Sequence, residues 1–87
     1  MFYVYLLRST KNRKYYTGFA QDLVSRFSKH NKGLVNSTRG GRPWELIYYE
    51  AYSSKKDALM RENRLKKSQQ ARTAMRGRLV HSIKIGG

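Results

Sequence analysis

The start of the chain contains two short runs of aromatic and β-branched residues, residues 2–8 and 13–19, with only four residues between them. Side chains of these types favour strands. The residues between the runs, 9–12 (STKN), are polar and typical of a turn. The pattern predicts an antiparallel β-hairpin, onto which the rest of a small fold has to pack.

The predicted hairpin sets two tyrosines against each other. With a turn at residues 9–12, Arg8 pairs with Arg13 and, three steps further from the turn, Tyr5 pairs with Tyr16. Directly opposed residues lie on one face of a sheet, so the two phenols are expected to be neighbours. A site built on two phenols is one interpretation. The other is that these are ordinary strand aromatics in a chain with seven tyrosines.

Further along, the same kinds of signal predict one more strand and three helices. Asp22 is a preferred N-cap residue and begins the first helix, which Gly33 ends. The predicted elements after the hairpin are a helix to about Lys32, a glycine-rich loop over residues 33–43, a strand over 44–52, a helix from Ser53 or Ser54 to about Lys67, and a helix from Ser68 to near Gly77.

These elements place the chain in the α+β class, as a small three-stranded antiparallel sheet flanked by helices in the order β-β-α-β-α-α. A chain of 87 residues has room for one domain. That domain is expected to cover residues 1–80, with a C-terminal tail over 81–87. Because so small a domain buries only about 60% of its unfolded surface, its core is expected to be thin.

The charge balance points to a polyanionic partner. Lysine and arginine total 19 against five acidic residues, which gives a net charge of +14. The excess is +6 over residues 1–53 and +8 over residues 54–87, so it is spread along the chain. A basic domain of this kind usually binds nucleic acid. Solubility alone is the alternative, and a membrane surface is disfavoured because no strongly apolar helix face opposes the charges.

The composition also excludes several classes of function. Without cysteine the chain forms no disulfide and carries out no thiolate chemistry. Neither a Walker loop nor a zinc-binding pattern nor a dinucleotide-binding fingerprint is present. The apolar run at residues 2–7 is too short for a signal sequence, and nothing approaches a membrane span. The cytoplasm is therefore the expected compartment.

The first predicted helix carries two side chains suited to phosphate chemistry. Arg26 and His30 are four residues apart and share one helix face. Arginine can grip a phosphate with two hydrogen bonds, and histidine can exchange a proton near neutral pH. Taken alone, the pair also fits an ordinary solvated helix face.

Glu62 occupies a position in the second helix where a carboxylate is unusual. Ala58, Leu59 and Leu65 are spaced as the apolar face of that helix, and Glu62 falls within the face. A carboxylate near a core is costly unless a cation pairs with it. Two explanations are open: a salt bridge to an arginine such as Arg26, or a metal such as Mg²⁺, which keeps several waters and needs few protein ligands.

Several motifs, taken in order, resemble those of a known family. Residues 3–5 (YVY) and 16–18 (YTG) resemble the paired motifs that name the GIY-YIG nuclease superfamily. Residues 36–48 (NSTRGGRPWELIY) and 61–66 (RENRLK) are similar to the small stand-alone members called YhbQ- or YazA-like. No single tripeptide is specific, but the ordered set is. The resemblance covers about residues 2–70.

The resemblance implies a site made of five side chains. One of Tyr5 and Tyr16 would help to activate the attacking water. Arg26 would stabilise charge on the scissile phosphate, and His30 would assist in proton transfer or contact a phosphate. Glu62 would hold one divalent ion, Mg²⁺ or Mn²⁺. These roles agree with what phosphodiester hydrolysis requires, namely a nucleophilic water and neutralisation of the phosphoryl charge.

The chain departs from the family pattern at several places. Tyr3 stands where the name motif has glycine, and Thr17 stands where it has isoleucine, but neither position has to supply chemistry. Gly18 keeps the motif glycine and is expected to allow a close approach beside Tyr16. Larger family nucleases often use an asparagine beyond the metal-binding helix, whereas this chain has none after Asn63.

Four further cations are expected to contact nucleic acid. They are Arg39 and Arg42 in the glycine-rich loop and Lys66 and Lys67 on the second helix. The alternative for the two lysines is that their stems cover apolar surface. Trp44 is expected in the core and not as a platform for a nucleic-acid base.

Two functions follow from these observations. The first is a metal-dependent endonuclease that hydrolyses phosphodiester bonds in nucleic acid, with DNA favoured over RNA and a place in DNA processing or repair. The second is a basic nucleic-acid-binding module on the same scaffold, with weak or no catalysis. The five retained motif side chains favour the first function. The absent asparagine, and the absence of a separate DNA-binding domain, favour the second.

Overall fold

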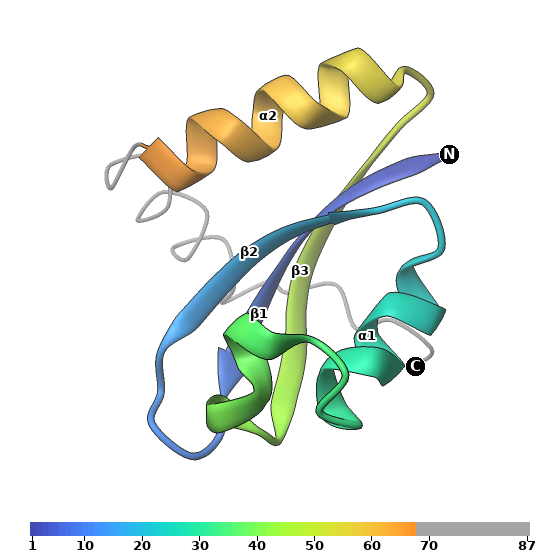
Figure 1. Cartoon of the computed structure of the whole chain (residues 1–87). Helices are drawn as coiled ribbons and strands as arrows, with labels where there is room; N and C mark the ends of the chain where they lie inside the picture. Colours follow the sequence, from blue (N-terminus) through green and yellow to red (C-terminus); the bar gives the residue numbers. More distant parts are fainter. Residues whose placement is uncertain (68–87) are drawn as a thin grey trace.

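The computed structural model describes residues 1–67, which form a small sheet with two α-helices and a short 3₁₀-helix (Figure 1). The elements are β1 (Phe2–Ser9), β2 (Tyr15–Ala20), α1 (Leu23–Asn31), η1 (Asn36–Gly41), β3 (Trp44–Tyr52) and α2 (Lys55–Lys67). The α+β class and the predicted order are confirmed as far as the second helix. The predicted third helix from Ser68 and the boundary at residue 80 lie outside the described residues.

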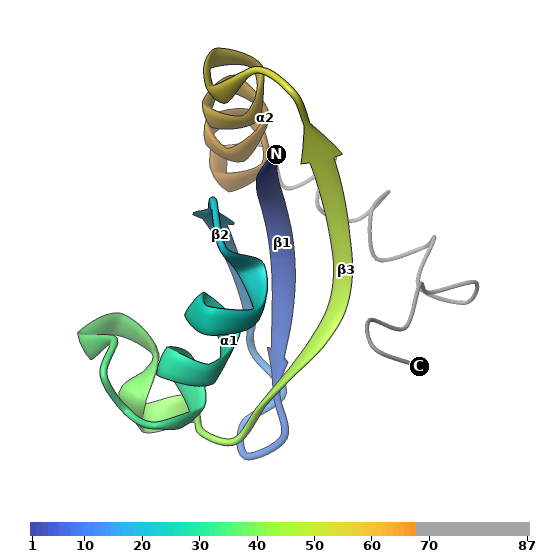
Figure 2. The same cartoon turned by 90° about the vertical axis from the view of Figure 1, so that its right-hand side faces the viewer.

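The sheet is antiparallel, with the strand order β2-β1-β3. β1 is therefore the central strand and is hydrogen-bonded on both sides, while β2 and β3 are the edges of the described sheet. α2 lies toward one end of the sheet, and α1 with η1 lies toward the other (Figure 2). The first strand of the predicted hairpin is thus the innermost strand of the sheet.

Each face of the sheet has its own core, because successive residues of β1 point to opposite faces. On one face, Val4 packs with Ala58 and Leu65 of α2. On the other, Tyr5 packs with Leu23 of α1. The aromatic residues of the N-terminal run are therefore shared between two thin cores.

The pairing of β1 with β2 differs from the sequence prediction. Tyr5 lies opposite Gly18, and Tyr16 lies opposite Leu7. The predicted pairing of Tyr5 with Tyr16, and of Arg8 with Arg13, is wrong by two residues. A slip of two preserves the alternation of side chains, so both tyrosines still point to the same face. Their rings pack with centroids 6.4 Å apart.

The cause of the slip is a connection that is longer than the four residues predicted. The buried Ser9 hydroxyl accepts hydrogen bonds from the backbone N–H groups of Lys11 and Asn12, both at 3.1 Å. Arg13 then adopts a left-handed conformation with φ of 61°. The Ser9 carbonyl accepts from the backbone N–H of Arg13 (3.0 Å) and closes the turn, and the β1–β2 ladder begins where Arg8 faces Tyr15.

The segment predicted as a loop over residues 33–43 contains η1 and is fastened to its neighbours. The backbone N–H of Trp44 donates to Asn31 Oδ1 (2.7 Å), and Asn31 Nδ2 donates to the Trp44 carbonyl (3.1 Å). The Trp44 indole Nε1 donates to the carbonyl of Thr38 (2.7 Å). Trp44 is buried, so its predicted place in the core is confirmed.

Candidate functional site

The site is built around Tyr5, which projects from the central strand. Gly18 of β2 lies directly opposite, and a Cβ atom at Gly18 would overlap Cζ and Oη of the tyrosine. The ring therefore lies across the β2 backbone, which requires glycine at this position. The sequence predicted a close approach at Gly18, but the group that approaches is Tyr5 and not the neighbouring Tyr16.

A hydrogen-bonded chain runs from Tyr5 into the interior. The Tyr5 hydroxyl lies 2.7 Å from Nε2 of His30, and Nδ1 of the same imidazole lies 2.7 Å from Oγ1 of Thr38. All three residues are buried. Both ring nitrogens of His30 are thus engaged, as a buried polar ring requires. The imidazole has no exposed surface.

Burial keeps both ends of the Tyr5–His30 pair neutral. It lowers the pKa of His30 to about 4, with a smaller lowering by the charge of Arg26. Burial also raises the pKa of Tyr5 to about 12, against the lowering effect of a hydrogen bond from Arg26. Because the two shifts run in opposite directions, transfer of the proton from the phenol to the imidazole is strongly unfavourable. At neutral pH the pair is therefore a fixed neutral hydrogen bond.

Tyr16 is the more accessible of the two phenols. It is half-buried, whereas Tyr5 has no exposed surface. Its ring contacts the edge of His30 (centroids 5.2 Å apart) and of Trp44 (6.4 Å). The second motif tyrosine thus covers the buried chain and is itself open on one side.

Arg26 reaches the same group of side chains from α1. Both a hydrogen bond and its charge lower the pKa of Tyr5, and its charge lowers the pKa of His30, so the guanidinium lies beside both rings. Its Nε is buried and has no hydrogen-bond partner among residues 1–67. A buried guanidinium N–H without an acceptor is costly, and a phosphate oxygen is a suitable acceptor.

Glu62 approaches from α2. Its charge contributes to the raised pKa of Tyr5, which places the carboxylate within electrostatic reach of the phenol. The side chain is 18% exposed and pairs with Lys66 Nζ at 3.0 Å. The predicted apolar face is partly wrong, because Leu59 is exposed while Ala58 and Leu65 are buried. The salt bridge considered from the sequence is also different, since the partner of Glu62 is Lys66 and not Arg26.

A separate cluster of charges ties α2 to the far edge of the sheet. Glu50 of β3 accepts from Arg61 Nε (2.9 Å) and Arg61 Nη2 (3.1 Å). The same carboxylate accepts from the hydroxyls of Tyr48 (3.0 Å) and Tyr52 (2.8 Å). These donors lower the pKa of Glu50, although burial alone would raise it. Because Arg61 precedes Glu62, this contact fixes the helix that carries the site carboxylate.

Comparison with known proteins agrees with this arrangement. Residues 1–76 match the GIY-YIG catalytic domain. The chain belongs to the GIY-YIG family. Similar proteins include the UPF0213 protein CPE1444 of Clostridium perfringens, 40% identical over 68 residues that cover 77% of this chain and 72% of the relative. The UPF0213 protein SSP2268 of Staphylococcus saprophyticus is 38% identical over 65 residues, which cover 74% and 78% respectively.

A solved structure is also similar to this GIY-YIG chain. The solution NMR structure of the UPF0213 protein BH0048 from Bacillus halodurans aligns with a TM-score of 0.55 and 32% sequence identity. The alignment covers 91% of this chain and 85% of the other. The family resemblance predicted from the ordered motifs is therefore confirmed, as is membership of its small single-domain group.

A divalent ion at Glu62 in this GIY-YIG domain would find a single carboxylate. Nowhere in residues 1–67 do three or more histidine, cysteine, aspartate or glutamate side chains gather. Mg²⁺ is often bound by one or two carboxylates together with waters and substrate phosphates. Glu62 fits that mode of binding, in which the ion is held jointly by the protein and a phosphate. Lys66 Nζ pairs with this carboxylate at 3.0 Å.

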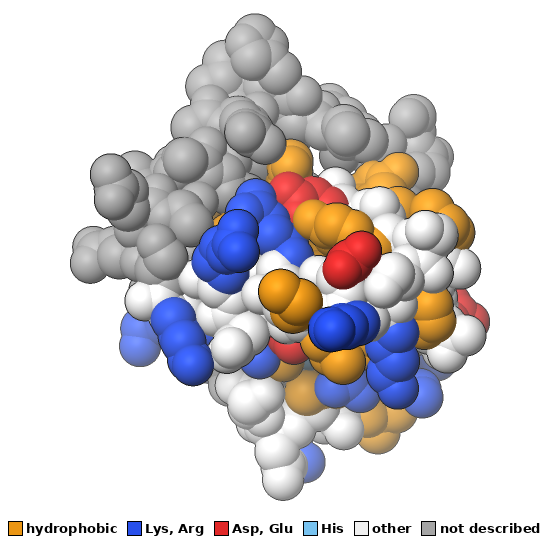
Figure 3. All heavy atoms as spheres, turned by 90° about the horizontal axis from the view of Figure 1, so that it is seen from above, with side chains coloured by type: hydrophobic (Ala, Val, Ile, Leu, Met, Phe, Trp, Pro, Cys, Tyr) orange, Lys and Arg blue, Asp and Glu red, His pale blue; other side chains and the backbone are white. Residues whose placement is uncertain are grey.

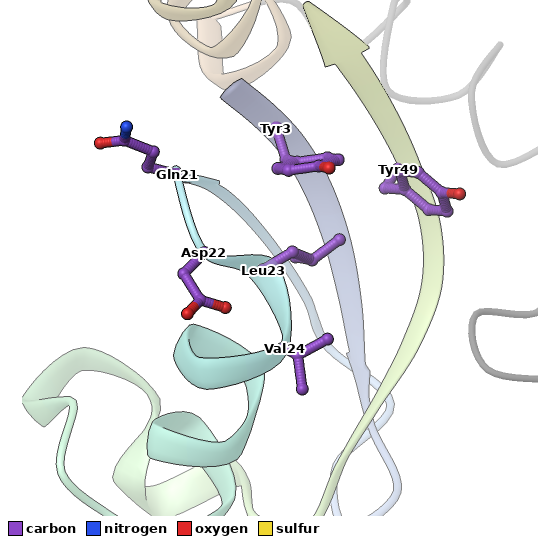
Figure 4. Close-up of a pocket in the computed structure, with 6 residues that line it drawn as sticks. All are labelled: Tyr3, Gln21, Asp22, Leu23, Val24 and Tyr49. Atoms are coloured by element: carbon purple, nitrogen blue, oxygen red, sulfur yellow. The ribbon is translucent and has the colours of Figure 1, made fainter. Parts of the chain in front are cut away.

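Two hollows flank the first turns of α1, and they differ in charge. One, of about 260 Å³, is lined by the cations Arg26 and Lys29. The other, of about 420 Å³, lies beside the rings of Tyr3 and Tyr49, whose centroids are 6.0 Å apart (Figure 4). Asp22 lines both, but in the second it meets no cation of the described lining. The hollow beside Arg26 is the one that suits a phosphate.

The four cations predicted to contact nucleic acid are exposed, but three of them have protein partners. Arg39 donates to the carbonyl of Gly33 and Arg42 to the carbonyl of Arg39, so both help to shape the η1 segment. Lys66 pairs with Glu62. Seen from the α2 side, lysine and arginine side chains are spread between hydrophobic ones (Figure 3). Within residues 1–67 no helix is long and apolar enough to span a bilayer.

Three residues around the site were not predicted from the sequence. Thr38 belongs to the run 36–48 of the resemblance, but its contact with His30 is a tertiary one with no local signal. Glu50 and Arg61 lie eleven residues apart on different elements. The spacing of apolar residues along the chain does not predict that they pair. The motif R-E-N pointed to the right turn of α2 without indicating what the arginine does.

Proposed function

We propose that this chain is a metal-dependent endonuclease that hydrolyses phosphodiester bonds in nucleic acid, with DNA favoured over RNA and a role in DNA processing or repair. The observation that carries the proposal is Arg26, whose buried Nε has no partner in the described part of the chain. It lines a hollow together with Lys29. A negatively charged acceptor with several oxygens suits this guanidinium, and a phosphodiester is such a group.

The proposed reaction uses each side chain for one task. Arg26 binds the scissile phosphate and stabilises the charge that develops on it. Tyr16, the more exposed phenol, accepts a hydrogen bond from the attacking water and so orients it. Tyr5 and His30 stay neutral and hold Arg26 in place. The water oxygen attacks phosphorus, the P–O ester bond breaks, and the proton that the water loses ends on the leaving oxygen, so the products are a phosphomonoester and a hydroxyl group.

A divalent ion at Glu62, either Mg²⁺ or Mn²⁺, would neutralise phosphoryl charge and lower the pKa of nearby oxygens when bound. Glu62 would be its protein ligand, and the phosphate would complete its binding. Arg39, Arg42, Lys66 and Lys67 are proposed to contact neighbouring phosphates. The cytoplasm remains the proposed compartment, on the grounds given by the sequence.

A second function is favoured by one specific observation, the ion pair between Glu62 and Lys66. If this pair persists when nucleic acid binds, the carboxylate is closed to a metal. The chain would then be a basic nucleic-acid-binding module with weak or no turnover. The absence of an asparagine after Asn63 supports the same alternative.

The test is a cleavage assay on duplex, flap, junction and single-stranded DNA and RNA with Mg²⁺ or Mn²⁺. The informative variant is Arg26→Lys, which keeps the charge but loses the planar fork of donors. Arg64→Lys is the matched control, because Arg64 is an exposed residue of α2. We expect cleavage by the wild type and the control, and a loss of about 100-fold or more in Arg26→Lys, as for removal of one transition-state donor.

Equal rates for the two variants would contradict the role of Arg26. If no substrate is cleaved but binding weakens steeply with salt, the binding-module function replaces the nuclease. Counterion release predicts a log–log slope of about −0.9 for each phosphate neutralised on duplex DNA.

A further inference from the structure

A continuous set of hydrogen bonds links η1 to Tyr5 through the interior of the domain. Thr38 Oγ1 lies 2.7 Å from His30 Nδ1, and His30 Nε2 lies 2.7 Å from the Tyr5 hydroxyl. The Thr38 hydroxyl also lies 3.4 Å from the carbonyl oxygen of Val35. Tyr5 and His30 are 0% exposed and Thr38 is 1% exposed, so water does not complete these hydrogen bonds.

Such a chain can run in two directions, because a neutral imidazole carries its proton on either nitrogen. In one direction, Tyr5 donates to Nε2, Nδ1 donates to Thr38, and Thr38 donates to the Val35 carbonyl. In the other, Thr38 donates to Nδ1 and Nε2 donates to Tyr5. The positions of the heavy atoms are the same in both.

Arg26 agrees with the first direction. A guanidinium has only donors, and a hydrogen bond from Arg26 is among the causes that lower the pKa of Tyr5, against the larger raising by burial. When Tyr5 donates to His30 Nε2, 2.7 Å away, its oxygen is free to accept from this guanidinium.

The Thr38 end of the chain separates the two directions. When Nδ1 carries the proton, the Thr38 oxygen accepts it and the Thr38 proton needs an acceptor of its own. The carbonyl of Val35 is close enough to serve. Thr38 is itself held in place, since its carbonyl accepts from the Trp44 indole at 2.7 Å.

We propose that Thr38 is a positioning residue: it holds His30 in the tautomer with the proton on Nδ1, so that Tyr5 donates to Nε2 and presents its oxygen to Arg26. Thr38 thus acts on the guanidinium through two intervening side chains. The direction of the chain stands on these contacts alone. Only its consequence for phosphate binding rests on the proposed function.

The tautomer is measured directly by long-range ¹H–¹⁵N NMR of the imidazole at neutral pH. The chain has two histidines, so His81→Gln leaves His30 as the only signal. We expect the proton on Nδ1 in the wild type and in Thr38→Ser, which keeps the hydroxyl. In Thr38→Val, which has the same shape but no acceptor, we expect the proton to move to Nε2.

Thr10→Val is the matched control, because the Thr10 hydroxyl donates to the Pro43 carbonyl (2.8 Å) at an exposed site away from His30. It should leave the tautomer unchanged. If the wild type is an active nuclease, Thr38→Val should lower kcat by up to about 100-fold, because misplacing a positioned group by about 1 Å can cost that much. Thr38→Ser should restore most of the rate.

A proton on Nε2 in the wild type would overturn the proposal, and this result needs no variant to fold. A proton that stays on Nδ1 in a folded Thr38→Val protein would also overturn it. Neither outcome depends on cleavage, so a protein that cleaves nothing can still show the predicted tautomer. In that case the nuclease function fails and the role of Thr38 in directing the chain stands.

Discussion

The two helices that approach Tyr5 hold their functional side chains in different ways. On the α1 side, His30 is buried, neutral and hydrogen-bonded at both ring nitrogens. On the α2 side, Glu62 is 18% exposed and is paired with a lysine of its own helix. In the first arrangement the hydrogen bonds are buried, so water cannot replace them. In the second, the carboxylate can exchange the lysine for another cation.

The two arrangements suit two different requirements of phosphodiester hydrolysis. The groups that orient an arginine have to stay in one geometry, and burial with complete hydrogen bonding achieves that. A carboxylate that takes up an ion with each substrate has to remain accessible. We expect substitutions on the α1 side to change the pH dependence of the free energy of unfolding. Substitutions on the α2 side should change metal-dependent activity.

The largest expected effect is a loss of cleavage activity in the Glu62→Gln variant. If the carboxylate holds the ion, the rate should fall by about 1000-fold, since a metal supplies several kcal/mol of transition-state stabilisation. Stability should change by less than about 0.5 kcal/mol, because an i,i+4 ion pair on a helix contributes little. Parallel rate and urea-unfolding measurements check this, with Asp57→Asn on the same helix as control. A large loss of stability with an unchanged rate would make Glu62 structural.

The next largest effect is a loss of stability on acidification that comes from His30. Its pKa is lowered by burial from 6.5 to about 4, so between these values the unfolded chain binds more protons than the folded one. Stability therefore falls as the pH drops through this window, by about 3 kcal/mol in all. Urea unfolding at pH 7, 6, 5 and 4 measures the loss. His30→Gln should flatten the curve, whereas His81→Gln should not.

The acidic side of that curve has a second contribution, from Glu50. Its pKa is lowered, so its stabilising effect is present above its ordinary value of 4.5 and is lost only below it. The fall in the free energy of unfolding between pH 6.5 and 5 therefore comes from His30. A curve that is flat in this upper range in the wild type would contradict a buried neutral His30.

A smaller loss is expected when the contact that fixes α2 is cut. Glu50→Gln removes the charge that accepts from Arg61 and two tyrosines, and it should destabilise the fold by about 2 kcal/mol. Glu45→Gln is the control, since Glu45 pairs with Arg8 where both side chains are nearly half exposed, and it should cost less than about 1 kcal/mol. Thermal unfolding compares them. Equal small losses would show that α2 is held by its apolar face alone.

The smallest expected effect is that of Lys66→Met. Loss of the i,i+4 pair should change stability by about 0.3–0.5 kcal/mol. If the lysine competes with the ion for Glu62, the Mg²⁺ concentration needed for half-maximal cleavage should fall by a few-fold. Lys56→Met, at an exposed position of the same helix, serves as control and should leave it unchanged. A higher Mg²⁺ requirement in Lys66→Met would indicate that contact of the lysine with phosphate outweighs its competition with the ion.

The sequence predicted the elements well because their signals are local. Alternating aromatics, the N-cap Asp22 and the terminating Gly33 specify strands and a helix within a few residues. The hairpin register could not be predicted in the same way. It depends on the Ser9 hydroxyl accepting from two backbone N–H groups and on the left-handed Arg13, and neither follows from residue preference.

The candidate site was predicted in part, and for a physical reason. Glu62 stood out because a carboxylate in an apolar face needs a partner, but the identity of that partner depends on which rotamer a neighbouring lysine adopts. His30 and Arg26 were identified by helical spacing together with the family motifs. Thr38 could not be, because its role arises only when η1 folds back onto α1. Burial, which sets the pKa of Tyr5 and His30, is a property of the assembled fold.

The position of Tyr5 on the central strand also bears on local motion. Edge strands open most easily in native proteins, and their amide hydrogens exchange sooner than those of strands paired on both sides. Tyr5 has its backbone in β1, paired with both neighbours, while its ring crosses Gly18 of the edge strand β2. Fraying of β2 would therefore uncover the phenol without moving the backbone that carries it. The Tyr5 amide is therefore expected to be among the slowest to exchange, even where β2 opens.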